Sequence, residues 1–385
     1  MKLEQLFGNE EARRGAFPVT AQRIFLAHAG VAPLPRVAVD AMREYLERGS
    51  GESQENPWVW EKVREARAAA ARLLRCVPED IALVGPTSFG LNLVANGLPW
   101  RPDDEVVYYG DDYPANVYPW TKLQAISVKP VPVRPERPGK ITWETIEAVL
   151  TGRTRLVALS SCHFLSGYRI DVETIGRRLR ERNILFCVDG IQTLGAFPLS
   201  VEFVDFLSAD SHKWLLGPAG AGIFYVRRAL QDVLKPTLLG SWNVVSPRYV
   251  AQDTIQFWSG GRRYEPGTLN LPGILGMLAS IRLLLEVGIE NISRRILELR
   301  RAFLEFVEPL GFTVYGDSAP GKNAASGIIS LMHPTRSVEE LVQKLQQANV
   351  IVSLRYDRSG TPLLRLSPHF YNTPEEIART AHLLR

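Results

Sequence analysis

The sequence has few cysteines and no apolar segment long enough to cross a membrane. Cys76, Cys162 and Cys187 are the only cysteines in 385 residues. Their odd number and wide spacing argue against a disulfide framework and favour free thiols in a reducing compartment. The longest apolar stretch, residues 273–289, is too short and is interrupted by Arg282. Since the N-terminus also lacks the apolar core of a secretory signal, we expect a cytoplasmic protein that does not bind membranes.

The sequence also lacks a strong excess of charge and any internal repeat. Its 45 basic and 41 acidic residues give a net charge of +4. This excess is too small and too scattered to indicate a nucleic-acid partner. No zinc-finger spacing occurs, and we predict no metal site. The length leaves room for a large core and favours two domains.

Short apolar runs alternate with helical patterns between residues 82 and 226. Nearly continuous apolar character is what a sheet covered on both faces requires of its strands. Between two of the runs, Asp171 is a good N-cap, and Val172, Ile175 and Leu179 share one helical face. The pattern predicts an α/β domain with a mostly parallel sheet. The predicted strands are residues 81–85, 105–109, 155–160, 184–189, 204–210 and 222–226.

Beyond residue 271 the pattern changes to that of a smaller α+β domain. Two of its predicted helices open with capping boxes, Ser337 with Glu340 and Thr373 with Glu376. We therefore divide the chain into two domains. They are a large α/β domain, residues 20–265, and a small C-terminal α+β domain, residues 266–385, which also includes residues 1–19.

Polar side chains follow two of the predicted strands at the points where the strands end. Asp189 closes one strand and Gln192 follows it, while the next strand leads to Ser211, His212 and Lys213. Ligands of open α/β sheets bind beyond the carboxyl ends of the strands. An acid, an amide and a lysine are therefore expected to meet at one edge of the sheet.

A phosphate site is predicted upstream, where "LVGPTSFGLNLVAN" reads as strand, turn and helix start. Thr87 and Ser88 place hydroxyl groups beside the free N–H groups of a helix N-terminus. One ligand needs all of these groups, namely pyridoxal 5′-phosphate. Its aldehyde takes a lysine as Schiff base, its ring nitrogen takes a carboxylate, its phenolic oxygen takes a neutral donor, and its phosphate takes the helix N-terminus.

The segments "VDGIQTLGA", "SHKWLLGPAGAGIFYV" and "RYEPGTLN" carry a resemblance to a known family. The chain resembles the class V aminotransferases, a family of fold-type-I pyridoxal-phosphate enzymes that includes cysteine desulfurases, selenocysteine lyases, kynureninases and isopenicillin-N-epimerase-like proteins. The resemblance covers nearly the whole chain. It implies the α/β fold of these enzymes, a large cofactor-binding domain and a smaller C-terminal α+β domain.

Carried over residue by residue, the resemblance implies a cofactor site. Lys213 would form the Schiff base, Asp189 would pair with the ring nitrogen, and Gln192 would donate to the phenolic oxygen. Tyr113 would stack on the ring, and we count it with Lys213 and Asp189 as catalytic. The residues implied to hold the phosphate are Thr87, Ser88, Ser211 and His212.

The resemblance also implies a substrate site and a second subunit. Arg365 would clamp the carboxylate of an amino-acid substrate, a task suited to a guanidinium group. His28 lies on the loop that usually lines the substrate pocket. Thr268, in "RYEPGTLN", matches the segment that reaches the partner subunit's phosphate, so we expect a homodimer.

Departures from the family pattern bear on the reaction. The segment "SLRYDRSGTPLLR" before Arg365 has no cysteine, which argues against a standard cysteine desulfurase. Tyr113 occupies the place of a desulfurase histidine, Phe164 replaces an asparagine beside the cofactor, and Asp210 replaces a phosphate-binding serine. We expect an aminotransferase or a Cα/Cβ lyase. The alternatives are a C–S lyase of the desulfurase or selenocysteine lyase type, an amino-acid epimerase, and a cofactor-binding regulator without catalysis.

Overall fold

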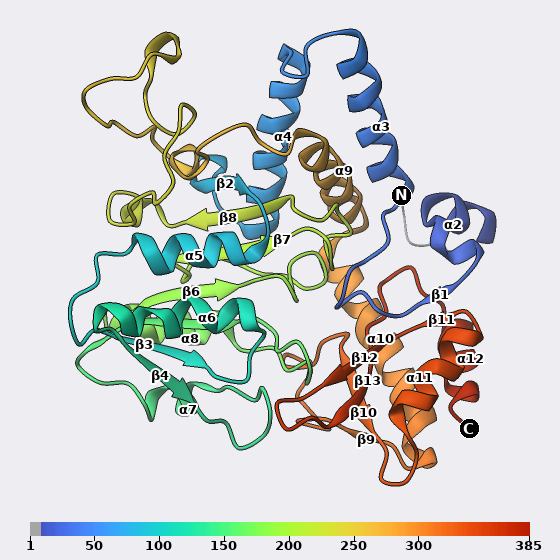
Figure 1. Cartoon of the computed structure of the whole chain (residues 1–385). Helices are drawn as coiled ribbons and strands as arrows, with labels where there is room; N and C mark the ends of the chain where they lie inside the picture. The colour runs from blue at the N-terminus through green and yellow to red at the C-terminus, as the bar shows by residue number, and fades with distance from the viewer. Residues whose placement is uncertain (1–8) are drawn as a thin grey trace.

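A seven-stranded sheet forms the centre of the larger part of the molecule (Figure 1). The structure, a computed structural model, describes residues 9–385. Strand β8 is antiparallel to both of its neighbours, and all other neighbours are parallel. The strand order is β2 (Ile81–Val84), β8 (Gly222–Val226), β7 (Phe206–Asp210), β6 (Leu185–Asp189), β5 (Thr154–Ser160), β3 (Glu105–Tyr109) and β4 (Lys129–Val133). The six strands expected from the sequence are confirmed.

Strand β4 was not expected, because its sequence, "KPVPV", contains two prolines. Proline cannot donate a hydrogen bond to a neighbouring strand, and it is therefore confined to the edges of sheets. β4 is such an edge strand, paired only with β3. The two prolines that made this strand hard to predict from the sequence are thus tolerated because the strand lies at the edge of the sheet.

Helices cover both faces of the large sheet, which explains why its strands are apolar throughout. Successive side chains of a strand point to opposite faces. Accordingly, Val106 of β3 packs in a core with Leu91 and Trp120, whereas Val107 belongs to a separate core on the other face. The helices are α5 (Thr87–Gly97) and α6 (Tyr118–Thr121) on the first face, and α4 (Pro57–Leu74), α8 (Val172–Glu181) and α9 (Leu271–Val287) on the second.

The C-terminal part contains a four-stranded antiparallel sheet with helices against it, as the α+β prediction required. Its β12–β13 hairpin extends toward the large sheet (Figure 1). The strands, in spatial order, are β12 (Ser353–Tyr356), β13 (Pro362–Leu366), β10 (Ile329–Met332) and β9 (Thr313–Val314). The helices are α10 (Ile289–Val307), α11 (Val338–Gln347) and α12 (Pro374–Leu383).

Of the two expected capping boxes, one is complete. At the start of α12, Thr373 accepts from the backbone of Glu376, and the Glu376 side chain accepts from the backbone of Thr373. At the start of α11, Ser337 accepts from the backbone N–H of Glu340, but its hydroxyl group donates to Glu339 and no return bond forms. The Thr373 prediction is confirmed, and the Ser337 box is only half formed.

Two elements cross the domain boundaries drawn from the sequence. Strand β1 (Ile24–Phe25) pairs with β11 (Val350–Ile351), and Ile24 is buried in the core of the C-terminal part. Helix α9, in contrast, packs against α4 and against α3 (Arg36–Gly51), in the core of the large sheet. Helix α2 (Glu10–Ala16) lies beside the C-terminal part. Residues 1–8 of the proposed small domain lie outside the described residues.

None of the helices within residues 9–385 is by itself both long and apolar enough to span a membrane. Helices α9 and α10 have the required length and composition only when taken together, and they are bent by 80° at the break between them. Nearly all apolar side chains of α9 are buried inside the protein.

Candidate active site

A pocket of about 270 Å³ opens where the large sheet faces the β12–β13 hairpin. It lies at the carboxyl ends of β6 and β7, as expected of a ligand site in an α/β sheet. Residues from both parts of the molecule form its walls. The predicted site residues that line it are Thr87, Ser88, Tyr113, Asp189, Gln192, His212, Lys213 and Arg365.

Lys213 is held in this pocket by the residue that follows it. The Trp214 ring donates to the Gln192 side-chain oxygen at 2.9 Å, and the Trp214 carbonyl group accepts from His369 at 3.0 Å. Both contacts are buried, so the main chain beside Lys213 is fixed. The lysine itself is only 8% exposed. Burial, together with the positive charge of Arg365, lowers the pKa of the Lys213 amine to about 8, although the Asp189 carboxylate opposes this shift.

Asp189 ends β6, and its carboxylate has one hydrogen-bond donor in the described chain. Its Oδ1 accepts from the backbone N–H of Ile191 at 3.0 Å. Burial raises the pKa of the Asp189 carboxyl group to about 7, and the nearby Asp112 charge adds to this effect. A cationic partner would restore the charged form of such a carboxylate. The site is therefore suited to a protonated ring nitrogen.

Gln192 lines the pocket, but its amide group already has partners. Its nitrogen donates to the carbonyl oxygen of Ala29 at 3.1 Å, and its oxygen accepts from Trp214. One amide N–H remains for a ligand. Gln192 therefore joins the loop of residues 29–31 to the lysine segment, and its proposed contact with a phenolic oxygen stays a prediction.

The N-terminus of α5 forms another side of the pocket. Pro86 precedes the helix, and no side chain caps its first turn. Thr87 accepts from the backbone N–H of Asp210 at 2.9 Å, and Ser208 donates to the Thr87 carbonyl oxygen at 2.9 Å. Gly90 permits this close approach, because a Cβ there would clash with Ser208. The helix is thus docked on β7, beside Lys213, with uncapped N–H groups suited to a phosphate.

Asp210, which replaces a phosphate-binding serine of the family, does not line the pocket. Its carboxylate accepts from the backbone N–H groups of Ser211 at 2.6 Å and Gly220 at 3.1 Å, and it lies 2.9 Å from Nδ1 of His212. The role of Asp210 is therefore to orient the loop and the imidazole ring that lines the pocket.

The structure does not bring the Ser211 side chain into the pocket, and its proposed contact with the phosphate stays a prediction. Ser211 is fully buried, does not line the pocket, and donates from its hydroxyl group to the carbonyl oxygen of Pro218 at 2.7 Å. The hydroxyl group closes the loop that follows β7. The position of Ser211, two residues before Lys213, does not indicate that its side chain turns toward Pro218 and away from the pocket.

The His28 side chain also lies outside the pocket, and its proposed contact with substrate stays a prediction. The loop lines the pocket through Ala29, Gly30 and Val31. His28, in contrast, has no exposed surface, and its Nδ1 donates to the Ser367 carbonyl oxygen at 2.8 Å. Its Nε2 therefore accepts from the Tyr371 hydroxyl group at 2.6 Å. Burial lowers the pKa of His28 well below its ordinary value, so the ring is a neutral core group.

Arg365 presents unpaired donors to the pocket. Its Nη1 donates to the carbonyl oxygen of Phe164 at 2.8 Å, whereas Nε and Nη2 are buried without a partner in the described chain. Burial lowers the pKa of the Arg365 guanidinium to about 9, and the positive charge of Arg355 contributes. Unpaired buried N–H groups are costly, and a carboxylate would satisfy them in a bidentate way.

Arg355 also lines the pocket and was missed in the sequence. The strand pairing between β12 and β13 places it on the same face as Arg365, because Ser353 lies opposite Arg365 and Arg355 follows two residues later. The alternation in "SLRY" was the available signal. It could not be used without knowing which strand pairs with which.

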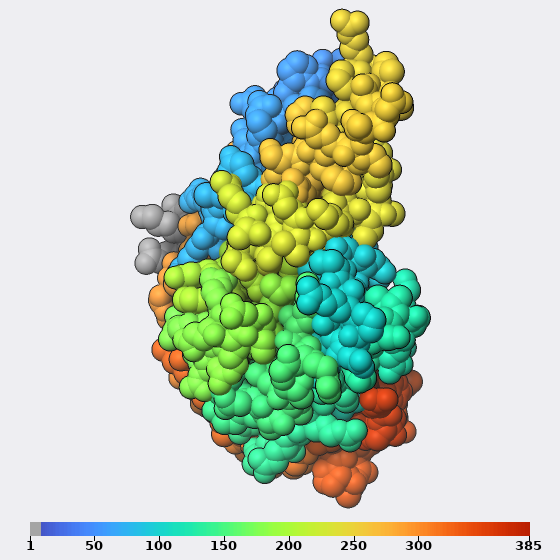
Figure 2. All heavy atoms as spheres, turned by 90° about the vertical axis from the view of Figure 1, so that its left-hand side faces the viewer, coloured from blue at the N-terminus to red at the C-terminus, as the bar shows by residue number. Residues whose placement is uncertain are grey.

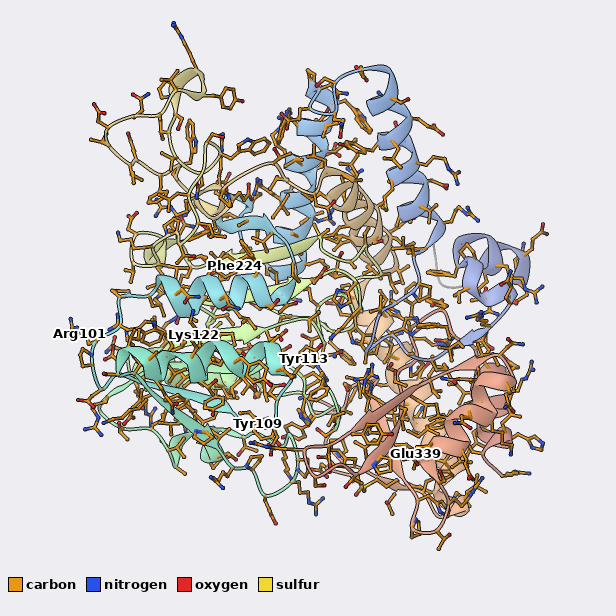
Figure 3. All side chains as sticks on the ribbon, in the orientation of Figure 1. Arg101, Tyr109, Tyr113, Lys122, Phe224 and Glu339 are labelled. Atoms are coloured by element: carbon orange, nitrogen blue, oxygen red, sulfur yellow. The ribbon has the colours of Figure 1, made fainter. Side chains whose placement is uncertain are left out.

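Tyr113 lies beside the lysine, between α6 and the C-terminal part (Figure 3). Nζ of Lys213 is 5.3 Å from the centre of its ring, and the Phe164 ring meets it edge-on at 5.5 Å. The ring is 48% exposed. An aromatic face is therefore available at the pocket, and its stacking on a cofactor stays a prediction. Thr268 is exposed and lies outside the pocket, so its proposed role toward a partner also stays a prediction.

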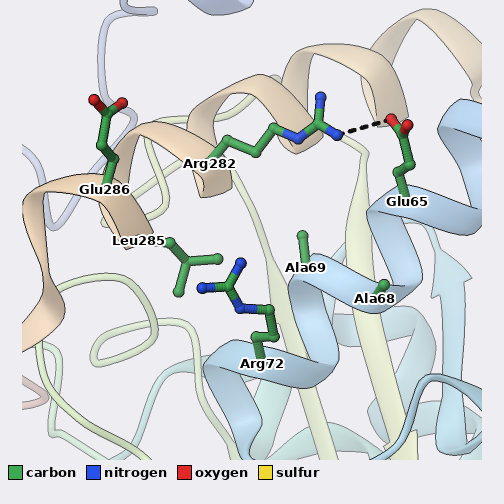
Figure 4. A pocket seen from close by; sticks show the side chains of 7 residues that line it. All are labelled: Glu65, Ala68, Ala69, Arg72, Arg282, Leu285 and Glu286. Atoms are coloured by element: carbon green, nitrogen blue, oxygen red, sulfur yellow. Dashed lines mark hydrogen bonds and ion pairs between the residues drawn. The ribbon is translucent and has the colours of Figure 1, made fainter. Parts of the chain in front are cut away.

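A second hollow, of about 330 Å³, lies between α4 and α9 (Figure 4). The ion pair between Arg282 and Glu65, at 2.9 Å, crosses its rim. It contains none of the predicted site residues. Its lining is Glu65, Ala68, Ala69, Arg72, Arg282, Leu285 and Glu286.

Comparison with known proteins identifies the family. The model of the class-V aminotransferases matches residues 24–379. The chain belongs to the class-V aminotransferase family. It is accordingly a pyridoxal-phosphate-dependent enzyme, and the cofactor and enzyme class expected from the sequence are confirmed.

Several relatives of this class-V enzyme are named as cysteine desulfurases. A probable cysteine desulfurase of Methanothermobacter thermautotrophicus is 28% identical and covers 97% of this chain and 96% of its own length. An uncharacterized aminotransferase of Bacillus subtilis is 27% identical, with 95% of each chain covered. The solved cysteine desulfurase of Thermococcus onnurineus is 24% identical, with a TM-score of 0.88 over 97% of this chain and 96% of that chain. This likeness confirms the predicted fold.

The residues of this chain fit the family cofactor. The pocket joins a buried amine, a buried carboxylate with one donor, and an uncapped helix N-terminus, which are the groups that the aldehyde, the ring nitrogen and the phosphate require. The Nε and Nη2 groups of Arg365 remain unpaired beside these groups.

Proposed function

We propose that this class-V enzyme is an aminotransferase or a Cα/Cβ lyase in which Lys213 holds the cofactor and moves the substrate proton. The observation that carries this proposal is the meeting of Lys213, Asp189 and Arg365 in one pocket of about 270 Å³. These groups come from β6, β7 and β13, and their meeting supports a built site rather than a surface lysine.

Pyridoxal 5′-phosphate supplies an aldehyde that condenses with amines and a ring that withdraws electrons from the substrate Cα. Asp189 would pair with the nitrogen of that ring, because a buried carboxylate with few donors gains most from a cationic partner. Ser88 and the first turn of α5 hold the phosphate. His212, oriented by Asp210 at 2.9 Å, supports the same end of the pocket.

Lys213 is suited to proton transfer as well as to covalent binding. Its lowered pKa, about 8, keeps a useful fraction of the amine neutral near neutral pH. When it is not bound to the cofactor, the Lys213 amine would serve as the base that holds the proton taken from the substrate Cα. Arg365 fixes the substrate carboxylate with its free Nε and Nη2 groups.

The position of the cysteines does not support a desulfurase that uses an enzyme thiol. None of Cys76, Cys162 and Cys187 lines the pocket, and burial raises the pKa of all three thiols. Between β12 and β13 the chain makes a tight turn, in which Asp357 accepts from the backbone of Ser359 and Thr361. Carbon–sulfur cleavage that releases sulfur to solution stays open as a second candidate. One structural relative is named a cystine C–S lyase in complex with cysteine persulfide.

The apolar side chains of the segment between β8 and α9 support a homodimer. This segment protrudes from the body of the molecule (Figure 2). Tyr249, Val250 and Ile255 are 78%, 59% and 64% exposed, which is typical of a surface that another subunit covers. Thr268 lies near the C-terminal end of this segment and is exposed, and its hydroxyl group would reach the partner's pocket. Light scattering that shows a fully active monomer would refute the dimer.

The test of the function is a substrate panel. The purified protein, loaded with pyridoxal phosphate, is mixed with single amino acids, with and without a 2-oxo acid acceptor. Acceptor-dependent keto acid indicates transamination, and pyruvate or ammonia without acceptor indicates a lyase. A holoprotein that changes no amino acid and shows no spectral response to any would contradict the proposal and favour a regulator. Rapid sulfide release from cysteine would instead restore the desulfurase.

A further inference from the structure

Two arginines line the pocket, although the proposed function needs only one for the substrate α-carboxylate. They differ in depth. Arg365 is 1% exposed, whereas Arg355 is half-buried at the rim. Both stand on one face of the β12–β13 hairpin, since Ser353 lies opposite Arg365 and precedes Arg355 by two residues.

The two guanidinium groups approach the same point. A Cβ on Gly30 would lie 3.6 Å from Nη2 of Arg355 and 3.8 Å from Nη2 of Arg365. A side chain at this position would therefore occupy the space between the two cations. Like charges held this close repel each other, and the arrangement is most favourable when an anion binds to each of them.

The protein itself supplies no such anion to Arg355. Nη1 of Arg355 donates to the carbonyl oxygen of Leu354 at 2.9 Å, and no carboxylate within residues 9–385 forms an ion pair with it. Arg358, on the same hairpin, is in contrast paired with Asp111 at 2.9 Å. Among the described residues that line the pocket, Asp189 is the one carboxylate. The hairpin side of the pocket therefore has uncompensated positive charge.

We propose that Arg355 binds a carboxylate at the end of the substrate side chain, so that the enzyme prefers dicarboxylic amino acids. This inference rests on the proposed function and specifies its substrate class. The buried Arg365 takes the α-carboxylate, and the rim residue Arg355 takes the distal one. An uncharged side chain would displace water from the Arg355 guanidinium without giving it a partner, which is unfavourable.

The first test measures binding without turnover. Glutarate and butyrate are titrated into the holoenzyme by calorimetry, because neither has an amine that can react. We expect glutarate to bind at least about tenfold more tightly, as a charge-assisted hydrogen bond predicts. Arg355→Gln should abolish this preference, and Arg355→Lys should keep part of it. Arg358→Gln removes the same charge from the same hairpin outside the pocket and should leave the preference unchanged.

The second test compares kcat/KM for glutamate and norvaline, which differ in the distal carboxylate. The ratio should fall by about tenfold or more in Arg355→Gln. An equal loss for both substrates would overturn the inference, because Arg355 would then serve the α-carboxylate. Equal binding of glutarate and butyrate by the wild type would also overturn it. If no amino acid reacts but glutarate binding still depends on Arg355, the proposed reaction fails and the anion site stands.

Discussion

The two walls of the pocket differ in how completely their polar groups are already bonded. On the wall of the large sheet, the segments that carry Asp189 and Lys213 are fixed by main-chain and Trp214 hydrogen bonds. On the wall of the hairpin, Arg365 keeps free donors and Arg355 has no ion-pair partner within residues 9–385. The first wall is preorganised for a constant cofactor, and the second is open to a substrate that is exchanged in every turnover.

The largest effect should follow from removing the amine of the first wall. Lys213→Ala should lower activity by on the order of a thousandfold or more, because both the covalent attachment and the proton transfer are lost. The visible absorbance of the bound cofactor should change, and borohydride should no longer fix the cofactor to the chain by mass spectrometry.

Lys344→Ala, on an exposed position of α11, is the matched control and should keep full activity. The melting temperature of Lys213→Ala should be no lower than that of the wild-type apoprotein, since burying a charged lysine is unfavourable for folding. If Lys213→Ala kept borohydride-stable labelling at a single site, another lysine would hold the cofactor.

The next largest effect should come from Asp189. Asp189→Asn keeps the shape of the side chain but removes its negative charge. The protonated form of the ring nitrogen would then no longer be favoured by a nearby carboxylate. We expect a fall in kcat of about a hundredfold, with cofactor still bound. Stopped-flow absorbance should place the loss in the step after substrate binding. An unchanged kcat would show that the Asp189 carboxylate does not act on the ring.

Asp189 and Lys213 of the first wall could be predicted from the sequence, whereas the second wall could be predicted only in part, since Arg365 was expected and Arg355 was missed. Asp189 and Lys213 directly follow strands whose apolar runs are easy to recognise, and adjacent parallel strands bring their ends together. Arg355 depended on the pairing of β12 with β13, which the sequence does not display. His28 and Ser211 have the right sequence positions, but their side chains turn into the core.

The fold, like the site, has elements that the sequence predicts and elements that it does not. Six strands of the large sheet were predicted because burial on both faces makes them uniformly apolar. β4 was missed, since prolines at an edge remove that signal. Elements that pack with a partner distant in sequence cross the predicted domain boundaries, as β1 does with β11.

The second wall can be tested through Arg365. Arg365→Gln should raise KM for any amino acid by about tenfold to a hundredfold, because the α-carboxylate loses a bidentate partner. In contrast to Asp189→Asn, kcat should change less than KM. Titration of the holoenzyme absorbance with amino acid measures this directly. A variant with normal KM would mean that the α-carboxylate binds elsewhere, and the two walls would then not divide cofactor from substrate.

His28 tests the same comparison from outside the pocket, because its side chain is buried against Ser367 and Tyr371 and does not line the second wall. His28→Ala should reduce the free energy of unfolding by on the order of 2 kcal/mol. The buried Tyr371 hydroxyl group would lose its partner, and the Ser367 carbonyl group would keep only the backbone N–H of residue 28. Urea denaturation should show this loss. At urea concentrations too low to unfold the protein, KM and the cofactor absorbance of His28→Ala should be nearly the same as those of the wild type. A normal stability with a raised KM would instead return His28 to the substrate pocket.

The smallest effect is expected at the tip of the hairpin, where Arg358 and Asp111 link the two walls through solvent-exposed side chains. Exposed ion pairs contribute little, because water screens them and both side chains lose freedom. Arg358→Gln should leave kcat/KM within about twofold, and the salt dependence of kcat/KM should match that of the wild type. A large, salt-dependent fall would mean that the hairpin is positioned by this contact. The open donors of the second wall would then depend on a link to the first, and the two walls could not be treated as independent.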